Sequence, residues 1–316
     1  MNNSKKVVLI GAGMVGMSFA YSALNQNLCD ELVIIDINKQ KAQGEAMDLN
    51  HGLSFSHSSM KISAGDYTEC KDADIAVICA GVNQKPGESR LSLLSRNAEV
   101  FKTVISPLME SGFSGIILVA TNPVDIMTRV SLELSKLPPE RVFGTGTTLD
   151  TARLRYLLGK YFSVDPRNVH AYVMGEHGDS EFTPWSQALI ATKPIEKVIE
   201  TNSDRFNWVD LQKISSEVRD AAQMIIKAKG ATYYGIGIAI SRIVRAILRD
   251  EQSVLTVCSL LNGEYGRKGV YVGSPCIVGR KGVERTVELS LTKEETEKLH
   301  VSCDLLTECY DELETS

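Results

Sequence analysis

The sequence lacks the features of a membrane, secreted or nucleic-acid-binding protein. No apolar run approaches the roughly 18 residues of a membrane span, and the N-terminus lacks the apolar region and cleavage site of a secretory signal. The seven cysteines form no close pairs at metal-like spacing, and their odd number is typical of reduced thiols. The net charge of −5 gives no electrostatic support to nucleic-acid binding. We therefore expect a cytoplasmic protein without a metal site.

What is present is the composition of a globular protein. The chain has 316 residues, of which 43% are hydrophobic and 23% charged. This is enough to bury a full core in two domains or one large domain.

A glycine-rich turn follows the first apolar run. Val7–Ile10 is typical of a strand buried on both faces, and a helical pattern begins near Val15. Glycines between a strand and a helix permit a tight turn and the close approach of a pyrophosphate, which the free N–H groups of the helix start can bind. The turn therefore predicts dinucleotide binding by Gly11, Gly13, Met14, Val15 and Gly16.

An acid ends the next apolar run. Asp36 lies 20 residues after Gly16, where a carboxylate accepts a hydrogen bond from a ribose 2′-OH. A carboxylate there would also repel a 2′-phosphate, so the residue favours NAD over NADP. The alternative is that Asp36 only caps the next turn.

Further apolar runs at 74–80 and 115–120 alternate with helical patterns at 39–49 and 96–109. Such alternation predicts a parallel sheet with helices on both faces and ligands beyond the carboxyl ends of the strands. Asn122 stands at such an end, where it could bind substrate or nicotinamide, or only stabilise the turn before Pro123.

The segment from Gly81 to Arg90 contains two glycines and a proline and starts where a strand ends. Active-site lids are often loops of this kind. Arg90 is then either an ordinary surface arginine or a cation that closes over a substrate and polarises a carbonyl oxygen.

One histidine lies between glycines and acids in the segment Met174–Ser180. Histidine exchanges a proton near neutral pH, and the glycines leave the ring of His177 approachable. Upstream, Asp150 and Arg153 are three residues apart in a helical pattern and share a face. Asp150 could accept a hydrogen bond from His177, and Arg153 could bind a carboxylate with two parallel hydrogen bonds. A purely structural ion pair is the alternative.

Five motifs in order resemble those of bacterial L-lactate dehydrogenases, within the lactate/malate dehydrogenase superfamily. They are Gly11–Gly16, Asn83–Arg90, Thr121–Pro123, Thr148–Arg153 and Gly175–Asp179. The resemblance implies an α/β fold: a Rossmann-type doubly wound parallel sheet in an NAD-binding domain at residues 1–144, followed by an α+β substrate-binding domain at 145–316.

The resemblance also implies a reaction, the NADH-dependent and reversible reduction of pyruvate to L-lactate at the end of glycolysis. Arg153 would bind the substrate carboxylate, and Arg90 would stabilise charge growing on the carbonyl oxygen. His177 would donate the proton, and Asp150 would fix the tautomer of its ring.

Further roles are implied for residues around the substrate. The family position that matches Gln84 carries glutamine in lactate enzymes and arginine in malate enzymes. A neutral side chain there favours pyruvate over oxaloacetate, because the second carboxylate of oxaloacetate would lack a cationic partner. Thr232 resembles a substrate-pocket position, and Ile236 resembles the apolar residue behind the nicotinamide. Gly81 and Asn122 are expected to contact the cofactor.

Arg155 and His170 resemble the pair with which many bacterial relatives bind fructose 1,6-bisphosphate as an allosteric activator across a subunit interface. Their alternative roles are a surface charge and a strand-end residue. A homotetramer is the family expectation, with a dimer as the alternative.

The second half combines helices and strands. We expect helices at 206–229 and 233–248, strands at 253–261, 270–278 and 284–290, and a hairpin turn at Gly279–Gly282. Thr292 and Glu295 form a capping-box pattern before a last helix.

Two rival functions stay open. One is a malate dehydrogenase or a broader 2-hydroxy-acid dehydrogenase, and the other is a catalytically silent NAD-binding protein. The intact set of Asp150, Arg153 and His177 argues against the second.

Overall fold

The computed structural model of the chain describes residues 4–82 and 90–314. Its centre is one nine-stranded sheet, in the order β12-β11-β10-β6-β5-β4-β1-β2-β3. The strands from β6 to β3 are parallel: β1 (Lys6–Ile10), β2 (Glu31–Ile35), β3 (Lys61–Ala64), β4 (Ile75–Ile78), β5 (Ile116–Val119) and β6 (Val142–Gly144). The antiparallel strands β10 (Ser253–Asn262), β11 (Lys268–Gly279) and β12 (Gly282–Thr286) extend this sheet beside β6.

The strand order reverses between β1 and β4, which are neighbours in the sheet although two strands separate them in sequence. A crevice forms at such a point, beyond the carboxyl ends of the strands. The structure therefore confirms the expected doubly wound parallel sheet of the Rossmann type.

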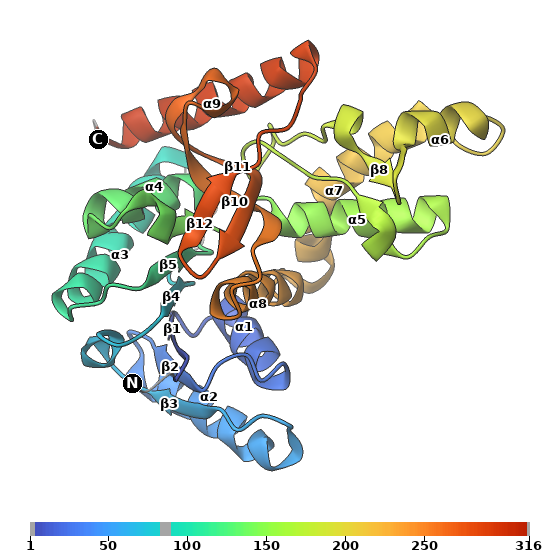
Figure 1. Ribbon diagram of the computed structural model, residues 1–316. Helices are drawn as coiled ribbons and strands as arrows, with labels where there is room; N and C mark the ends of the chain where they lie inside the picture. The colour runs from blue at the N-terminus through green and yellow to red at the C-terminus, as the bar shows by residue number, and fades with distance from the viewer. Residues whose placement is uncertain (1–3, 83–89, 315–316) are drawn as a thin grey trace.

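Helices cover both faces of the parallel strands. Figure 1 shows α3 (Arg90–Glu110) and α4 (Val124–Ser135) on one side, and α1 (Met14–Asn25) and α8 (Tyr234–Leu248) on the other. The remaining helices are α2 (Lys39–Gly52), α5 (Thr148–Phe162), α6 (Ile195–Thr201), α7 (Trp208–Lys229) and α9 (Lys293–Glu314). A small separate sheet contains β7 (Val169–His170), β8 (Leu189–Ile190) and β9 (Lys193–Pro194).

Alternate residues of each parallel strand supply two different cores. Val8 and Ile10 of β1 join the cluster under α3 and α4, whereas Val7 and Leu9 join the cluster under α1 and α8. Successive side chains of a strand point to opposite faces, so a strand covered on both faces is apolar throughout. This explains why the short runs in the sequence are continuous rather than alternating.

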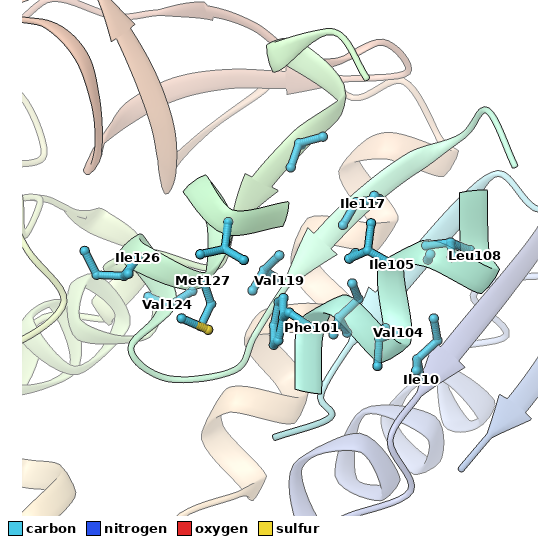
Figure 2. Close-up of a cluster of buried hydrophobic side chains, with 14 of the residues drawn as sticks. Ile10, Phe101, Val104, Ile105, Leu108, Ile117, Val119, Val124, Ile126 and Met127 are labelled. Atoms are coloured by element: carbon cyan, nitrogen blue, oxygen red, sulfur yellow. The ribbon is translucent and has the colours of Figure 1, made fainter. Parts of the chain in front are cut away.

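The cluster under α3 and α4 is drawn in Figure 2. Phe101 and Ile105 of α3 face Ile117 and Val119 of β5, and Met127 of α4 closes the cluster from the side. Phe101 is fully buried. The packing fixes where β5 ends, and therefore where the loop that carries Asn122 leaves the sheet.

Several expected boundaries differ from the structure. Helix α3 begins at Arg90, whereas the sequence pattern predicted a start near residue 96. The prediction was late because Ser92 and Ser95 weaken the helical pattern in this part of the sequence. The last strand ends at Thr286 rather than at residue 290: beyond it, the Leu289 N–H donates to the Tyr265 hydroxyl at 2.9 Å instead of to a strand. Helix α4 was not expected.

The turn and cap predictions for the second half are confirmed. Gly279 pairs with Gly282 in the hairpin between β11 and β12. Before α9, the Thr292 N–H donates to Glu295 at 2.9 Å, and the Glu295 N–H donates to the Thr292 hydroxyl at 3.2 Å. All seven cysteines are free thiols. Across residues 4–82 and 90–314, no helix combines the length and the hydropathy of a membrane-spanning segment.

We predict that Phe101→Ala lowers the free energy of unfolding by about 3–5 kcal/mol, because it leaves a cavity in a core that cannot collapse around it. Denaturant unfolding at fixed protein concentration measures the change. The matched control is Phe55→Ala, whose ring is 94% exposed, with an expected change within about 0.5 kcal/mol. Equal effects of the two substitutions would contradict this account of the core.

Candidate active site

The loop that carries His177 is fixed at both ends. Met174 and Phe182 exchange two backbone hydrogen bonds of 2.9 Å, and Gly175 and Gly273 of β11 exchange two of 3.0 Å. Gly175 has φ +99°, and a Cβ there would lie 2.7 Å from the hydroxyl oxygen of Ser302. Only glycine fits this position, so the sequence forces the turn that presents the imidazole.

The predicted cluster of Asp150, Arg153 and His177 exists in the structure. Asp150 Oδ2 lies 2.7 Å from His177 Nδ1, and Asp150 Oδ1 accepts a hydrogen bond of 2.7 Å from Arg153 Nη1. The Asp150 side chain is only 2% exposed, whereas that of His177 is 26% exposed. The acid is therefore enclosed between its two partners, whereas part of the imidazole remains exposed.

Charge holds a proton on the imidazole. Burial alone would lower the pKa of His177, but the nearby Asp150 carboxylate outweighs burial, and the pKa rises to about 9. Burial would likewise raise the pKa of Asp150, but His177 and then Arg153 keep that pKa below its ordinary value. At pH 7 the cluster thus consists of an imidazolium, a carboxylate and a guanidinium.

Arg153 keeps hydrogen-bonding capacity for a ligand. Within the described ranges, Asp150 is the only hydrogen-bond partner of its guanidinium. The fork has five N–H donors, so a second carboxylate can bind the remaining ones in parallel. The cluster can therefore bind a carboxylate beside a proton donor.

Asp125, on α4, positions the histidine loop, although no pattern in the sequence marked this residue. Its Oδ2 accepts the backbone N–H of His177 at 2.9 Å, and the side chain is 2% exposed. Burial raises the pKa of this carboxyl to about 6. Because Asp125 follows the end of β5 by only a few residues, this bond brings His177 to the crevice of the parallel sheet.

Glu181 was also missed. One oxygen of its carboxyl, one of Asp150 and a ring nitrogen of His177 all lie within 4.8 Å of one another. Metal ligands could be arranged in this way, but Asp150 already uses both oxygens in hydrogen bonds to Arg153 and His177. We interpret the group as a site that handles a proton.

The glycine turn fits a dinucleotide. It borders a cavity of ≈ 640 Å³ that Gly11, Gly13, Asp36, Gly81 and Val82 help to line. Gly11 has φ +105°, and a Cβ there would lie 2.6 Å from the backbone nitrogen of Ala80. A Cβ at Gly13 would meet no protein atom within 4 Å, so its absence leaves room for a ligand at the uncapped N-terminus of α1.

Asp36, which also lines this cavity, accepts two backbone hydrogen bonds. Its Oδ2 accepts the Ala12 N–H at 2.7 Å, and its Oδ1 accepts the Asn38 N–H at 2.9 Å. The residue thus braces the glycine turn and also caps the next turn. Each carboxylate oxygen keeps a lone pair for a ribose hydroxyl.

Asn97 holds the other strand ends together, although no signal in the sequence marked it. Its side chain is fully buried on α3. It accepts the Val82 N–H at 2.8 Å and donates to the Asn122 carbonyl at 3.3 Å. These bonds connect the chain after β4 to the chain after β5. The side chain of Asn122 itself is exposed at the crevice.

Ile236, expected near the nicotinamide, and Thr232, expected near the substrate, lie around the start of α8. A Cβ at Gly237 would lie 2.7 Å from the backbone of Ser18, so α8 packs closely on α1. Ile236 is half-buried against the same cluster as Val15. Thr232 lies in the loop just before α8.

The other expected residues are placed only in part. Arg155 points away from Arg153, as its spacing predicts: its Nε donates to the Ala171 carbonyl at 3.0 Å. The adjacent His170 is exposed on β7. Arg90 is the first residue of α3, but its side chain lies outside the described part, as does all of Gln84.

Comparisons with known proteins agree across the whole chain. Residues 5–144 match the family model "lactate/malate dehydrogenase, NAD binding domain", and residues 147–315 match "lactate/malate dehydrogenase, alpha/beta C-terminal domain". An L-lactate dehydrogenase of Geobacillus sp. (strain WCH70) is 51% identical over 312 residues, which are 98% of each chain.

Two solved structures are similarly close. A lactate dehydrogenase enzyme from a Medee basin deep-sea metagenome library is 51% identical, with a TM-score of 0.97 over 99% of this chain and 100% of that one. The minor L-lactate dehydrogenase of Enterococcus mundtii in its ligands-bound form is 46% identical, with a TM-score of 0.96 over 98% of each chain.

We predict that Asp150→Asn lowers the pKa of His177 from about 9 to about 7 or below, because burial then acts without the opposing charge. NMR titration of the imidazole, with His177 assigned by its substitution, measures the change. Asp165→Asn is the control, since Asp165 is exposed and bonded to Arg167 instead. A His177 pKa that stays near 9 in Asp150→Asn would show that another group holds the proton.

Proposed function

The chain belongs to the lactate/malate dehydrogenase family, and we propose that it catalyses the reversible, NADH-dependent reduction of pyruvate to L-lactate. The observation that carries the proposal is the cluster in which Asp150 binds both Arg153 and His177 at 2.7 Å. It places a carboxylate receptor beside a charged proton donor. An L-lactate dehydrogenase that is 51% identical to this chain over nearly its full length supports the same substrate.

The cofactor would be bound by the glycine turn and the strand ends. Gly13 leaves space for a pyrophosphate, whereas Gly11 and Gly16 allow the turn to pack closely, against the backbone of Ala80 and of Gly11 respectively. The backbone of Met14 and Val15 lies at the helix start. Asp36 would accept hydrogen bonds from the adenosine ribose, and Gly81, Asn122 and Ile236 would contact the rest of the molecule. When bound, NADH supplies a hydride to the carbonyl carbon of the substrate.

The chain's own residues do the remaining work. Arg153 binds the substrate carboxylate, with Asn122 and Thr232 around it, and Arg90 stabilises negative charge on the carbonyl oxygen. His177 donates its proton to that oxygen, and Asp150 stabilises the imidazolium beforehand. In the direction of lactate oxidation, neutral His177 accepts the proton. Reduction therefore needs a pH below the His177 pKa of about 9.

We also propose two domains, an NAD-binding domain at residues 1–144 and a substrate-binding domain at 145–316. Arg90 and Asn122 would reach the substrate from the first domain, and Ile236 would reach the cofactor from the second. The proposed boundary falls between β6, which ends at Gly144, and α5, which begins at Thr148 and carries Asp150 and Arg153.

A homo-oligomer, as a tetramer in the cytoplasm, is the proposed assembly. Large apolar side chains are exposed on three helices, with Tyr21, Tyr156 and Tyr234 each more than 60% exposed. These helices are neighbours: α8 packs on α1 at Gly237, and a Cβ at Gly235 would lie 3.1 Å from Leu149 at the start of α5. An exposed apolar surface of this kind favours association.

Fructose 1,6-bisphosphate is the proposed effector. Arg155 donates to the carbonyl of Ala171, the residue that follows the exposed His170. An arginine and a protonated histidine suit a phosphate. If two subunits present such pairs to each other, a bisphosphate removes their repulsion and shifts the assembly toward its active state.

We predict that kcat/KM for pyruvate exceeds that for oxaloacetate by about 100-fold or more, because a second carboxylate would be bound without a cation. Gln84→Arg should reverse the preference, and Lys85→Gln should leave it unchanged. NADH consumption measures all of these values. Faster turnover of oxaloacetate by the unmodified enzyme would favour malate dehydrogenase, and no consumption with either acid would favour a silent NAD-binding protein.

For the effector, we predict that the bisphosphate raises the rate at low pyruvate by roughly fivefold or more. The rate should be measured with and without the bisphosphate at pH 6 and at pH 7.5. Arg155→Gln should abolish it, whereas Arg167→Gln, which removes an exposed arginine bonded to Asp165, should not. An unchanged rate at both pH values would exclude this effector.

A further inference from the structure

The carboxyl group of Glu181 is held facing the His177–Asp150 pair. Glu181 immediately precedes Phe182, whose two backbone hydrogen bonds to Met174 measure 2.9 Å, and its own N–H donates to the Gly178 carbonyl at 3.2 Å. The backbone of Glu181 is therefore fixed relative to the histidine loop. One of its carboxyl oxygens lies within 4.8 Å of ligand atoms of both Asp150 and His177.

This carboxyl differs from that of Asp150 in having no bonded partner. Across the described ranges, the Glu181 side chain makes no hydrogen bond or ion pair, whereas Asp150 uses both oxygens. A poorly solvated carboxylate without a partner is costly, so the neutral acid is favoured. Burial, followed by the charge of Asp150, raises the pKa of Glu181 to about 8.

Charged groups from several elements face Glu181 and His177. Asp125 comes from α4, Asp150 and Arg153 come from α5, and Arg219 comes from α7. An ionised Glu181 would bring three carboxylates to the imidazole, and the substrate carboxylate at Arg153 would be a fourth. Repulsion among these anions opposes substrate binding unless one of them is neutral.

We infer that Glu181 is a positioning residue that carries its proton when pyruvate binds and that, once ionised, keeps the proton on the His177 imidazole. The first half rests on the proposed function, whereas the second half concerns the protein without substrate.

The two acids of the site then act over different pH ranges. Near pH 6 to 7, Glu181 is neutral, and Asp150, with a smaller effect of Asp125, stabilises the imidazolium. As the pH rises past about 8, Glu181 loses its proton first, and its new negative charge favours the charged form of the nearby ring. The imidazolium therefore persists to a higher pH than it would without Glu181, whereas the ionised acid weakens the binding of pyruvate.

The direct test is an NMR titration of His177 in Glu181→Gln without substrate. Because glutamine is neutral at every pH, we expect the pKa of His177 to fall by about one unit. Asp179→Asn removes an exposed charge from the same loop and should leave the pKa unchanged. An unchanged pKa in Glu181→Gln would overturn the inference, and this readout needs no catalysis, so it stands apart from the proposed function.

The pH profile of kcat/KM for pyruvate is the second test. Below pH 7, the kcat/KM of Glu181→Gln should stay within about threefold of the wild type, because glutamine resembles the neutral acid. Above pH 8, the KM for pyruvate should rise less in this variant than in the wild type, because no new negative charge forms beside the substrate carboxylate. Glu181→Asp retains an acid and should keep the alkaline rise in KM. A large loss of activity at pH 6 in Glu181→Gln, or identical profiles of the two variants, would contradict the assignment.

Discussion

The hydrogen bond between Asp150 and His177 is the interaction on which the site depends. It joins a helix that begins just after β6 to a loop 27 residues further along the chain, and its length is 2.7 Å. Asp150 can keep its charge in a buried position only because two cationic groups share its oxygens. The charged imidazole in turn exists at neutral pH only because that carboxylate is there.

The backbone around this bond is fixed by contacts that are distant in sequence. Asp125 holds the His177 N–H from α4, and Gly273 holds Gly175 from β11. The parallel sheet brings the cofactor cavity to the same crevice, through the strand ends that Asn97 ties together. A proton donor, a carboxylate receptor and a hydride source can therefore meet only when the whole sheet is assembled.

Local patterns were sufficient for the sheet, the glycine turn, the capping box and the Asp150–Arg153 pair, because each depends on residues close in sequence. They were not sufficient for Asp125, Asn97 and Glu181. An isolated acid or amide in a helix or loop has no sequence signature of its own. The roles of Asn97 and Asp125 arise from hydrogen bonds to residues 15 and 52 positions away, respectively. The predicted start of α3 was also wrong, because Ser92 and Ser95 have low helix propensity and tertiary packing stabilises the helix there.

Three carboxyl groups around one histidine show that position decides charge. Burial acts against the ionised form in all three, yet only Asp150 is held below its ordinary pKa, because it alone has both Arg153 and His177 as partners. Asp125 receives a backbone N–H and has a pKa of about 6, while Glu181, with no bonded partner in the described part, has a pKa of about 8. The number and charge of the hydrogen-bond donors thus order the three acids. A site with one permanent anion and one that forms only at high pH can keep its proton donor charged without rejecting an anionic substrate.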